Sequence, residues 1–218
     1  MPIPHTVFVT GATGYLGRPL AMWLLARGHT VRALVRRGSE RRAPPGAIQV
    51  PGDALRAETF ADAIAPADTL VHLVGTPRPS PAKAAEFLAV DLPSVRAAVE
   101  AALLAGVRHF VYVSVAHPAP VMRDYIAVRR EGERLIRESG IPATILRPWY
   151  VLGPGHRWPF ALLPLYALLA RLPSTREGAR RLGLVTQEQM LRALVHAIEE
   201  PAAGTRVIGV PEIREAAP

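Results

Sequence analysis

The sequence predicts an α/β fold, a doubly wound parallel sheet completed by a small C-terminal lobe. Two observations carry this prediction. A glycine-rich turn, Gly11-Ala-Thr-Gly-Tyr-Leu-Gly17, separates an apolar strand-like run from a helix-like segment near the N-terminus. Six apolar runs of strand length alternate with helical segments along the first two thirds of the chain. This alternation is typical of repeated β-α-β units, which build parallel sheets.

The composition excludes several chemistries. Of 218 residues, 50% are hydrophobic, which is enough for a sizeable core, and the absence of cysteine rules out disulfides, thiol catalysis and cysteine-ligated metals. The histidines show no metal-ligand spacing, so no metal site is expected. The net charge of +8 comes from arginines dispersed along the chain, and this dispersion favours no nucleic-acid partner. No signal peptide is recognised, and a cytoplasmic protein is expected.

The first unit is a strand over 5–10 and a helix over 15–27. Between them, Gly11 permits the tight turn, Gly14 lets backbone N–H groups approach a diphosphate, and Gly17 allows close packing of helix on strand. A helix N-terminus also favours a negative charge. Unless this is an ordinary turn, the pattern predicts binding of a dinucleotide cofactor by the loop and the start of the helix: Gly11, Thr13, Gly14, Tyr15, Leu16 and Gly17.

The second strand, 30–35, ends in Arg36 and Arg37. An acidic residue at this position would bind the ribose hydroxyls of an unphosphorylated adenosine, whereas arginine attracts a 2′-phosphate. The sequence therefore predicts that NADP(H) is preferred over NAD(H). The alternative is that the two arginines belong to a solvated loop.

A third strand over 46–50 leads to Asp53. This carboxylate either accepts a hydrogen bond from the adenine amino group or caps a helix over 57–64, and the two roles are compatible. The next two residues, Ala54 and Leu55, are expected at the cofactor as well.

Three further strands, 68–74, 107–114 and 141–147, are separated by helices over 82–105 and 121–139. Because the carboxyl ends of parallel strands meet at one edge, the binding site is expected there. The residues at these ends that we expect to contact the cofactor are Val74, Gly75, Ser114, Pro148, Trp149, Tyr150 and Val151.

The pattern changes after the sixth strand, so we divide the chain into a dinucleotide-binding domain, 1–156, and a small C-terminal lobe, 157–218. The apolar segment 158–172 is too short and too rich in proline to span a bilayer. A lid over a substrate pocket is the preferred interpretation, and contact with a membrane surface is the alternative. An amphipathic helix over 187–200 and a last strand over 205–210 follow.

These residues resemble the atypical extended short-chain dehydrogenase/reductases. The similar groups are the NAD(P)H-binding, NmrA-like proteins and the nucleotide-binding accessory subunit of respiratory complex I. The resemblance covers residues 4–156, and the motifs that carry it are the glycine loop, Arg36, Gly52-Asp53, Val-Tyr-Val-Ser114, Tyr125 and the run from Ile-Leu-Arg-Pro148 to Gly-Pro-Gly155. It implies a Rossmann fold and NAD(P) binding, with or without catalysis.

The resemblance also implies catalytic positions. In catalytic members a serine holds the substrate carbonyl, a tyrosine transfers the proton, and a lysine four residues later supplies a cation and binds the nicotinamide ribose. Ser114 and Tyr125 match the first two, and Arg129 stands where the lysine would be. One interpretation of Arg129 is that the protein has kept cofactor binding and lost the reductase activity. The other is that arginine has replaced the lysine with the function kept, in a chain whose one lysine is Lys83.

The leading hypothesis from the sequence is an NADP(H)-dependent oxidoreductase acting on a small carbonyl-type substrate. The alternative is an NADP(H)-binding protein without catalysis, serving as a redox sensor or as an assembly or regulatory partner. The expected partners are the dinucleotide and an unidentified small molecule, and a homodimer or a protein partner is compatible with both hypotheses. Nucleic-acid binding would rest on the net charge alone.

Overall fold

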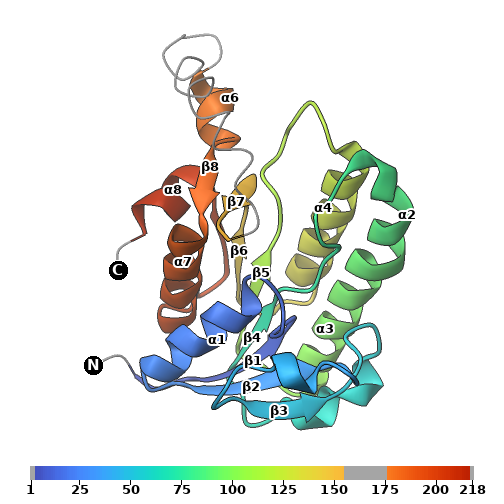
Figure 1. Ribbon diagram of the computed structural model, residues 1–218, viewed down its shortest axis with the longest axis vertical. Helices are drawn as coiled ribbons and strands as arrows, with labels where there is room; N and C mark the ends of the chain where they lie inside the picture. Colours follow the sequence, from blue (N-terminus) through green and yellow to red (C-terminus); the bar gives the residue numbers. More distant parts are fainter. Residues whose placement is uncertain (1–2, 155–175, 217–218) are drawn as a thin grey trace.

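The computed structural model describes residues 3–154 and 176–216. In this part of the chain the main sheet has seven parallel strands in the order β3-β2-β1-β4-β5-β6-β9 (Figure 1). Because the chain progresses outward from β1 first to one edge and then to the other, the sheet is doubly wound and the fold is Rossmann-like, as predicted. The strands are β1 (Thr6–Thr10), β2 (Thr30–Val35), β3 (Ile48–Pro51), β4 (Thr69–His72), β5 (His109–Val113), β6 (Ala143–Leu146) and β9 (Thr205–Ile208).

Helices cover both faces of this sheet (Figure 1). On one face lie α1 (Gly17–Ala26) and α7 (Gln187–Glu199), with α8 (Val210–Glu215) packed on α7. On the other face lie α3 (Leu92–Leu104) and α4 (Arg123–Glu138). Near α6 (Arg176–Arg181), the strands β7 (Tyr150–Leu152) and β8 (Leu184–Thr186) form a second, two-stranded parallel sheet.

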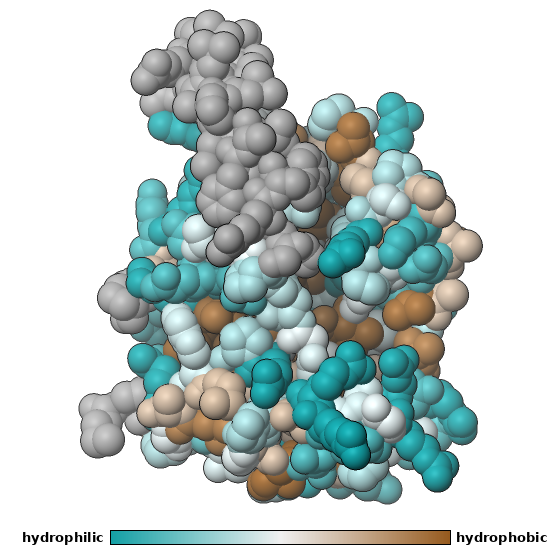
Figure 2. All heavy atoms as spheres, in the orientation of Figure 1, coloured by the Kyte–Doolittle hydropathy of each residue, from teal (hydrophilic) through white to brown (hydrophobic). Residues whose placement is uncertain are grey.

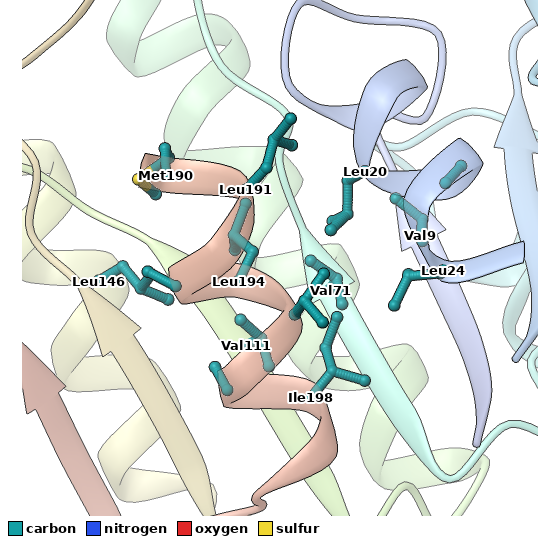
Figure 3. Packing of buried hydrophobic residues seen from close by; sticks show 14 of the residues in the cluster. Val9, Leu20, Leu24, Val71, Val111, Leu146, Met190, Leu191, Leu194 and Ile198 are labelled. Atoms are coloured by element: carbon teal, nitrogen blue, oxygen red, sulfur yellow. The ribbon is translucent and has the colours of Figure 1, made fainter. Parts of the chain in front are cut away.

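The core beneath α1 and α7 is aliphatic (Figure 3). Side chains from four neighbouring strands point toward the two helices, and all of them are buried: Val9, Val71, Val111 and Leu146. The apolar face of α7 meets them with Met190, Leu191, Leu194 and Ile198. The predicted amphipathic helix is therefore confirmed, and a capping box fixes its start because Thr186 and Gln189 each bind the other's backbone N–H.

The opposite face of the sheet has a second core. Alternate residues of the same strands point to it, among them Phe8, Leu70, Phe110 and Ile145, all fully buried. The ring of Phe60 stacks on Phe8 with centroids 5.9 Å apart. Strands buried on both faces are expected to be apolar without alternation, which is the pattern the sequence shows.

Two predicted helices differ from the structure. The segment 57–64 forms two short 3₁₀ turns, Ala57–Thr59 and Ala61–Ala63, because the Thr59 hydroxyl bonds back to the carbonyls of Asp53 and Arg56 and competes with helix formation. The segment 82–105 is interrupted, since 3₁₀ turn Pro81–Lys83, helix α2 (Ala84–Glu86) and π-helix Phe87–Asp91 precede α3. Pro93 explains the π-helical turn, because its ring would clash with the carbonyl four residues earlier.

The C-terminal region differs in detail as well. The strand β7 and its partner β8 were not predicted. The predicted last strand joins the main sheet as β9, but it ends at Ile208 and helix α8 begins two residues later. The apolar segment 158–172 lies outside the described residues, so its role as a lid stays a prediction. Within the ranges that the structure describes, no helix is long and apolar enough to cross a membrane.

Candidate functional site

A cleft of about 1270 Å³ runs along the carboxyl edge of the main sheet. The structure brings to it every residue predicted for the cofactor or for catalysis except Arg37. Ser39, Arg42, Thr76 and Arg78 line it too, although they were not among the predicted site residues. Hydrophilic residues gather on the surface over the β3 side of the molecule, and hydrophobic residues are visible at greater depth between them (Figure 2).

The glycine loop has the close backbone packing that a diphosphate site needs. Gly11 has a φ of +72°, and a Cβ there would lie 2.8 Å from the carbonyl carbon of Leu73 at the end of β4. A Cβ on Gly17 would lie 2.2 Å from the carbonyl oxygen of Gly11, so no larger residue fits between loop and helix. The α1 N-terminus has no side-chain cap. Its backbone N–H groups therefore fit an anionic group such as the diphosphate of a dinucleotide.

The end of β2 supplies positive charge. Arg36 lines the cleft, and Arg42 lies close by, where its guanidinium donates to the Ser39 hydroxyl at 2.9 Å. Arg37 is exposed and does not line the cleft. Among the described lining residues Asp53 is the one carboxylate, and its Oδ1 accepts the Leu55 N–H at 3.0 Å. Asp53 thus stabilises its own turn, and a contact with adenine stays a prediction.

Arg129 occupies the floor of the cleft as half of a buried ion pair. Its guanidinium donates to Oδ1 of Asp91 at 2.6 Å and to the Val113 carbonyl at 3.0 Å. The other oxygen of Asp91 accepts both the backbone N–H and the hydroxyl of Thr76, at 2.9 and 2.6 Å. A Cβ on Gly75 would lie 2.1 Å from this guanidinium. Arg129 and Asp91 therefore connect the ends of β4 and β5 with α4 and the π-helix.

Burial works against the charge of Arg129, but its neighbours Tyr125, Tyr112 and Asp91 outweigh burial and raise the pKa of the guanidinium further. It therefore stays charged throughout the physiological pH range. The ring of Tyr125 lies beside it, with the guanidinium carbon 5.1 Å from the ring centroid, and Phe87 packs on the same ring at 5.0 Å. Tyr125 is half-buried and lines the cleft together with Arg129.

Ser114, at the end of β5, belongs to a second buried network. Its hydroxyl donates to Oε1 of Glu133 at 2.6 Å. Glu133 is 1% exposed and also accepts bonds from Arg147, through Nε at 2.8 Å and through a terminal nitrogen, and from Arg137 at 3.0 Å. Burial favours the neutral acid, but the bonds from Arg147 and Ser114 outweigh it and lower the pKa of Glu133. His117 Nε2 lies 3.5 Å from this carboxylate and does not line the cleft.

The strength of these bonds decides where the Ser114 proton points. A hydrogen bond to a charged group contributes about 1.5–3 kcal/mol, whereas a bond between neutral groups contributes about 0.5–1.5 kcal/mol. The bond from Ser114 to the Glu133 carboxylate belongs to the stronger of these two classes.

Asp91 and Glu133 were missed in the sequence, although a signal for each exists. Each acid stands in a row of buried residues that are spaced at the helical period: Phe87, Asp91 and Val95 in one case, and Ile126, Glu133 and Ile136 in the other. A charge on the buried face of a helix is stable only with a partner, so both positions indicate ion pairs. The sequence does not reveal which arginine is the partner.

The fold and the cleft define a dinucleotide-binding protein of the Rossmann class. Residues 11–156 match the family described as NAD(P)H-binding, and the chain belongs to that family. This agrees with the resemblance to short-chain dehydrogenase/reductases.

The chain is similar to reductases over most of its length. It is 32% identical to ceramide reductase of Caulobacter vibrioides, covering 91% of this chain and 62% of the relative, so it spans under two thirds of that protein. It is also 32% identical to 3-diazoavenalumate denitrifying reductase of Streptomyces sp, covering 91% of this chain and 73% of the relative. The crystal structure of gox2253 superposes with a TM-score of 0.69 at 26% identity, covering 94% of this chain and 70% of that one.

Proposed function

We propose that the protein is an NADP(H)-dependent oxidoreductase that reduces a small carbonyl-type substrate. The observation that carries this proposal is one continuous cleft shared by the glycine loop, Arg36 and Tyr125. Its volume of about 1270 Å³ exceeds the ~300–1,000 Å³ usual for a single small ligand, which leaves room for a substrate beside the dinucleotide. The similarity to two reductases supports the same proposal.

The residues of the cleft have different roles in carbonyl reduction. NADPH, when bound, supplies the hydride that adds to the carbonyl carbon. The Tyr125 phenol gives its proton to the carbonyl oxygen as the C=O π bond breaks, so the product is an alcohol and the phenol regains a proton from solvent. Arg129, fixed by Asp91, keeps a positive charge next to the Tyr125 ring. Pro148, Trp149 and Val151 close the cleft near these residues.

Tyr125→Phe is expected to lower kcat for NADPH-dependent carbonyl reduction by about 10²–10⁴-fold, the usual contribution of a positioned proton donor. The measurement is NADPH oxidation at 340 nm with a panel of small ketones and aldehydes, together with NADPH affinity by calorimetry. Affinity is expected to stay within a few-fold, because only the phenol oxygen is removed. Tyr112→Phe is the comparison, because it also removes a tyrosine hydroxyl near Arg129, at 3.5 Å, but one that lies outside the cleft; its loss of turnover is expected to be much smaller than that of Tyr125→Phe. Unchanged turnover in Tyr125→Phe would contradict the assigned role.

Arg36→Ala is expected to weaken NADPH binding by about 10–100-fold and to leave NADH binding almost unchanged. The reason is that one charge-assisted contact to the 2′-phosphate is lost, worth about 1.5–3 kcal/mol. Calorimetric titrations with both cofactors at fixed salt test this. Arg37→Ala is the matched control, since its side chain carries the same charge but does not line the cleft. Equal weakening in the two variants would show a nonspecific charge effect, and no weakening would rule out a contact between Arg36 and the 2′-phosphate.

A second function, binding of NADP(H) without turnover, is favoured by one observation. Ser114 donates its hydroxyl proton to the buried acid Glu133, and Arg129 donates to the buried acid Asp91. A protein of this kind would bind another macromolecule in a manner that depends on the cofactor's redox state. Tight NADPH binding, no turnover across the carbonyl panel and a partner whose affinity changes with NADPH would establish this function in place of the first.

A further inference from the structure

Ser114 has one hydroxyl proton, and the structure shows where that proton goes. The donor bond to Glu133 is 2.6 Å long and both residues are buried, 3% and 1% exposed. A serine hydroxyl holds a single donor, so only its acceptor lone pairs remain for a ligand. A ligand group that meets Ser114 in this state must therefore donate a hydrogen bond.

The Glu133 carboxylate is fixed in place by cations. Arg147 contacts both of its oxygens, and Arg137 contacts the second oxygen. These contacts keep Glu133 ionised and leave it no freedom to turn away from Ser114. A substrate carbonyl could take the proton of Ser114 only by breaking a charge-assisted bond in favour of a neutral one, which is the weaker of the two.

The cleft thus offers two complementary groups. The Tyr125 phenol is a donor, while Ser114 is an acceptor, and both line the same cavity. We propose that Ser114 selects the substrate as a hydrogen-bond acceptor, so the substrate class is carbonyl compounds that carry a hydroxyl or N–H group near the carbonyl. Glu133 is the positioning residue that sets this polarity. The proposal rests on the reductase function given above, and it replaces the expectation that Ser114 donates to the carbonyl.

The experiment compares hydroxyacetone with butanone, two ketones of nearly the same shape that differ by a hydroxyl in place of a methyl group. Two readouts are used: kcat/KM with NADPH, and affinity for the NADP⁺-loaded protein by NMR titration, which needs no turnover. For each readout the ratio of hydroxyacetone to butanone is compared between the wild type and Ser114→Ala. Comparing ratios cancels the different intrinsic reactivities of the two ketones.

The expected result is that Ser114→Ala lowers the hydroxyacetone to butanone ratio about fivefold in both readouts, the value of one neutral hydrogen bond. An unchanged ratio, or an equal loss for both ketones, would overturn the proposal, since an equal loss is what a serine donating to the carbonyl predicts. If the binding ratio falls and neither ketone is reduced, the inference stands and the reductase function fails.

Two variants test the part played by Glu133. In Glu133→Gln the amide can donate to Ser114, which frees the serine proton for the cleft. Because the hydroxyl of hydroxyacetone both donates and accepts, this variant is tested with methoxyacetone, whose ether oxygen only accepts. The ratio of methoxyacetone to butanone is expected to rise above the wild-type value, and to rise more than in Ser114→Ala. Arg137→Gln is the matched control, because it removes a contact to the far oxygen of the same carboxylate and is expected to leave the ratio unchanged. NADPH affinity verifies that each variant is folded. A methoxyacetone to butanone ratio in Glu133→Gln no higher than in the wild type would also overturn the proposal.

Discussion

Replacing Asp91 with alanine is expected to lower the free energy of unfolding by about 3–5 kcal/mol, the cost of leaving a buried charge without its partner. Arg129 would keep only the Val113 carbonyl and a 3.5 Å contact to the Tyr112 hydroxyl, in a side chain that is 7% exposed. Thr76 would lose the acceptor of its N–H and hydroxyl as well. For a chain of this size, the loss corresponds to a Tm lower by roughly 6–20 °C.

The cause can be isolated with a double-mutant cycle. Asp91→Asn keeps an acceptor for Thr76, and adding Arg129→Met removes the buried charge, so the double variant is expected to be more stable than Asp91→Asn alone. Thermal and urea unfolding measure each corner of the cycle. Glu188→Ala is the matched control, since it breaks the exposed Glu188–Arg192 pair of α7 and is expected to cost under about 1 kcal/mol. Additive losses at Asp91 and Arg129 would show that the ion pair does not couple the two sites.

The strands and the amphipathic helix α7 were predictable because their signal is local. The central strands β1, β4, β5 and β6 are largely apolar at consecutive positions and buried on both faces, whereas the edge strands β3 and β9 are mostly exposed. Helix α7 repeats its apolar residues at the helical period. The glycine loop is local as a sequence signal too, since its three glycines stand within seven positions. Arg36 follows directly from the end of its strand. These features therefore lie where the sequence places them.

The features that the sequence did not reveal depend on contacts distant along the chain. Asp91 meets Arg129 38 positions later, and Ser114 meets Glu133 19 positions later. The polarity of Ser114 is set by such a contact, so a matching position in a family motif identifies the residue without determining its hydrogen bonding. The π-helix that brings Asp91 to the cleft requires a break in the helix next to Pro93, and β7 pairs with a strand some 30 residues away.

Lowering the pH from about 6.5 to 4.5 is expected to destabilise the protein through two buried histidines. The Ser94 hydroxyl donates its proton to the Asp91 carbonyl, so it can only accept from His72 Nε2, which lies 3.3 Å away. The His72 ring is therefore neutral with its proton on Nε2, and its Nδ1 accepts from the Thr10 hydroxyl. Burial, with the nearby Arg129, lowers the pKa of His72 to about 3. Burial, with Arg206 next, lowers the pKa of His109 to about 4.

The sign follows from proton uptake. At a pH between the folded pKa and the unfolded pKa near 6.5, the histidine binds a proton in the unfolded chain and not in the folded protein. The free energy of unfolding is therefore at its full value above about pH 6.5 and falls as the pH is lowered toward the folded pKa values. Each histidine contributes a slope approaching about 1.4 kcal/mol per pH unit. Urea unfolding at several pH values measures the slope, and His72→Gln and His109→Gln are each expected to reduce it. The exposed His196→Gln controls for loss of a histidine as such. A slope that neither buried variant reduces would assign the acid sensitivity to the carboxylates instead.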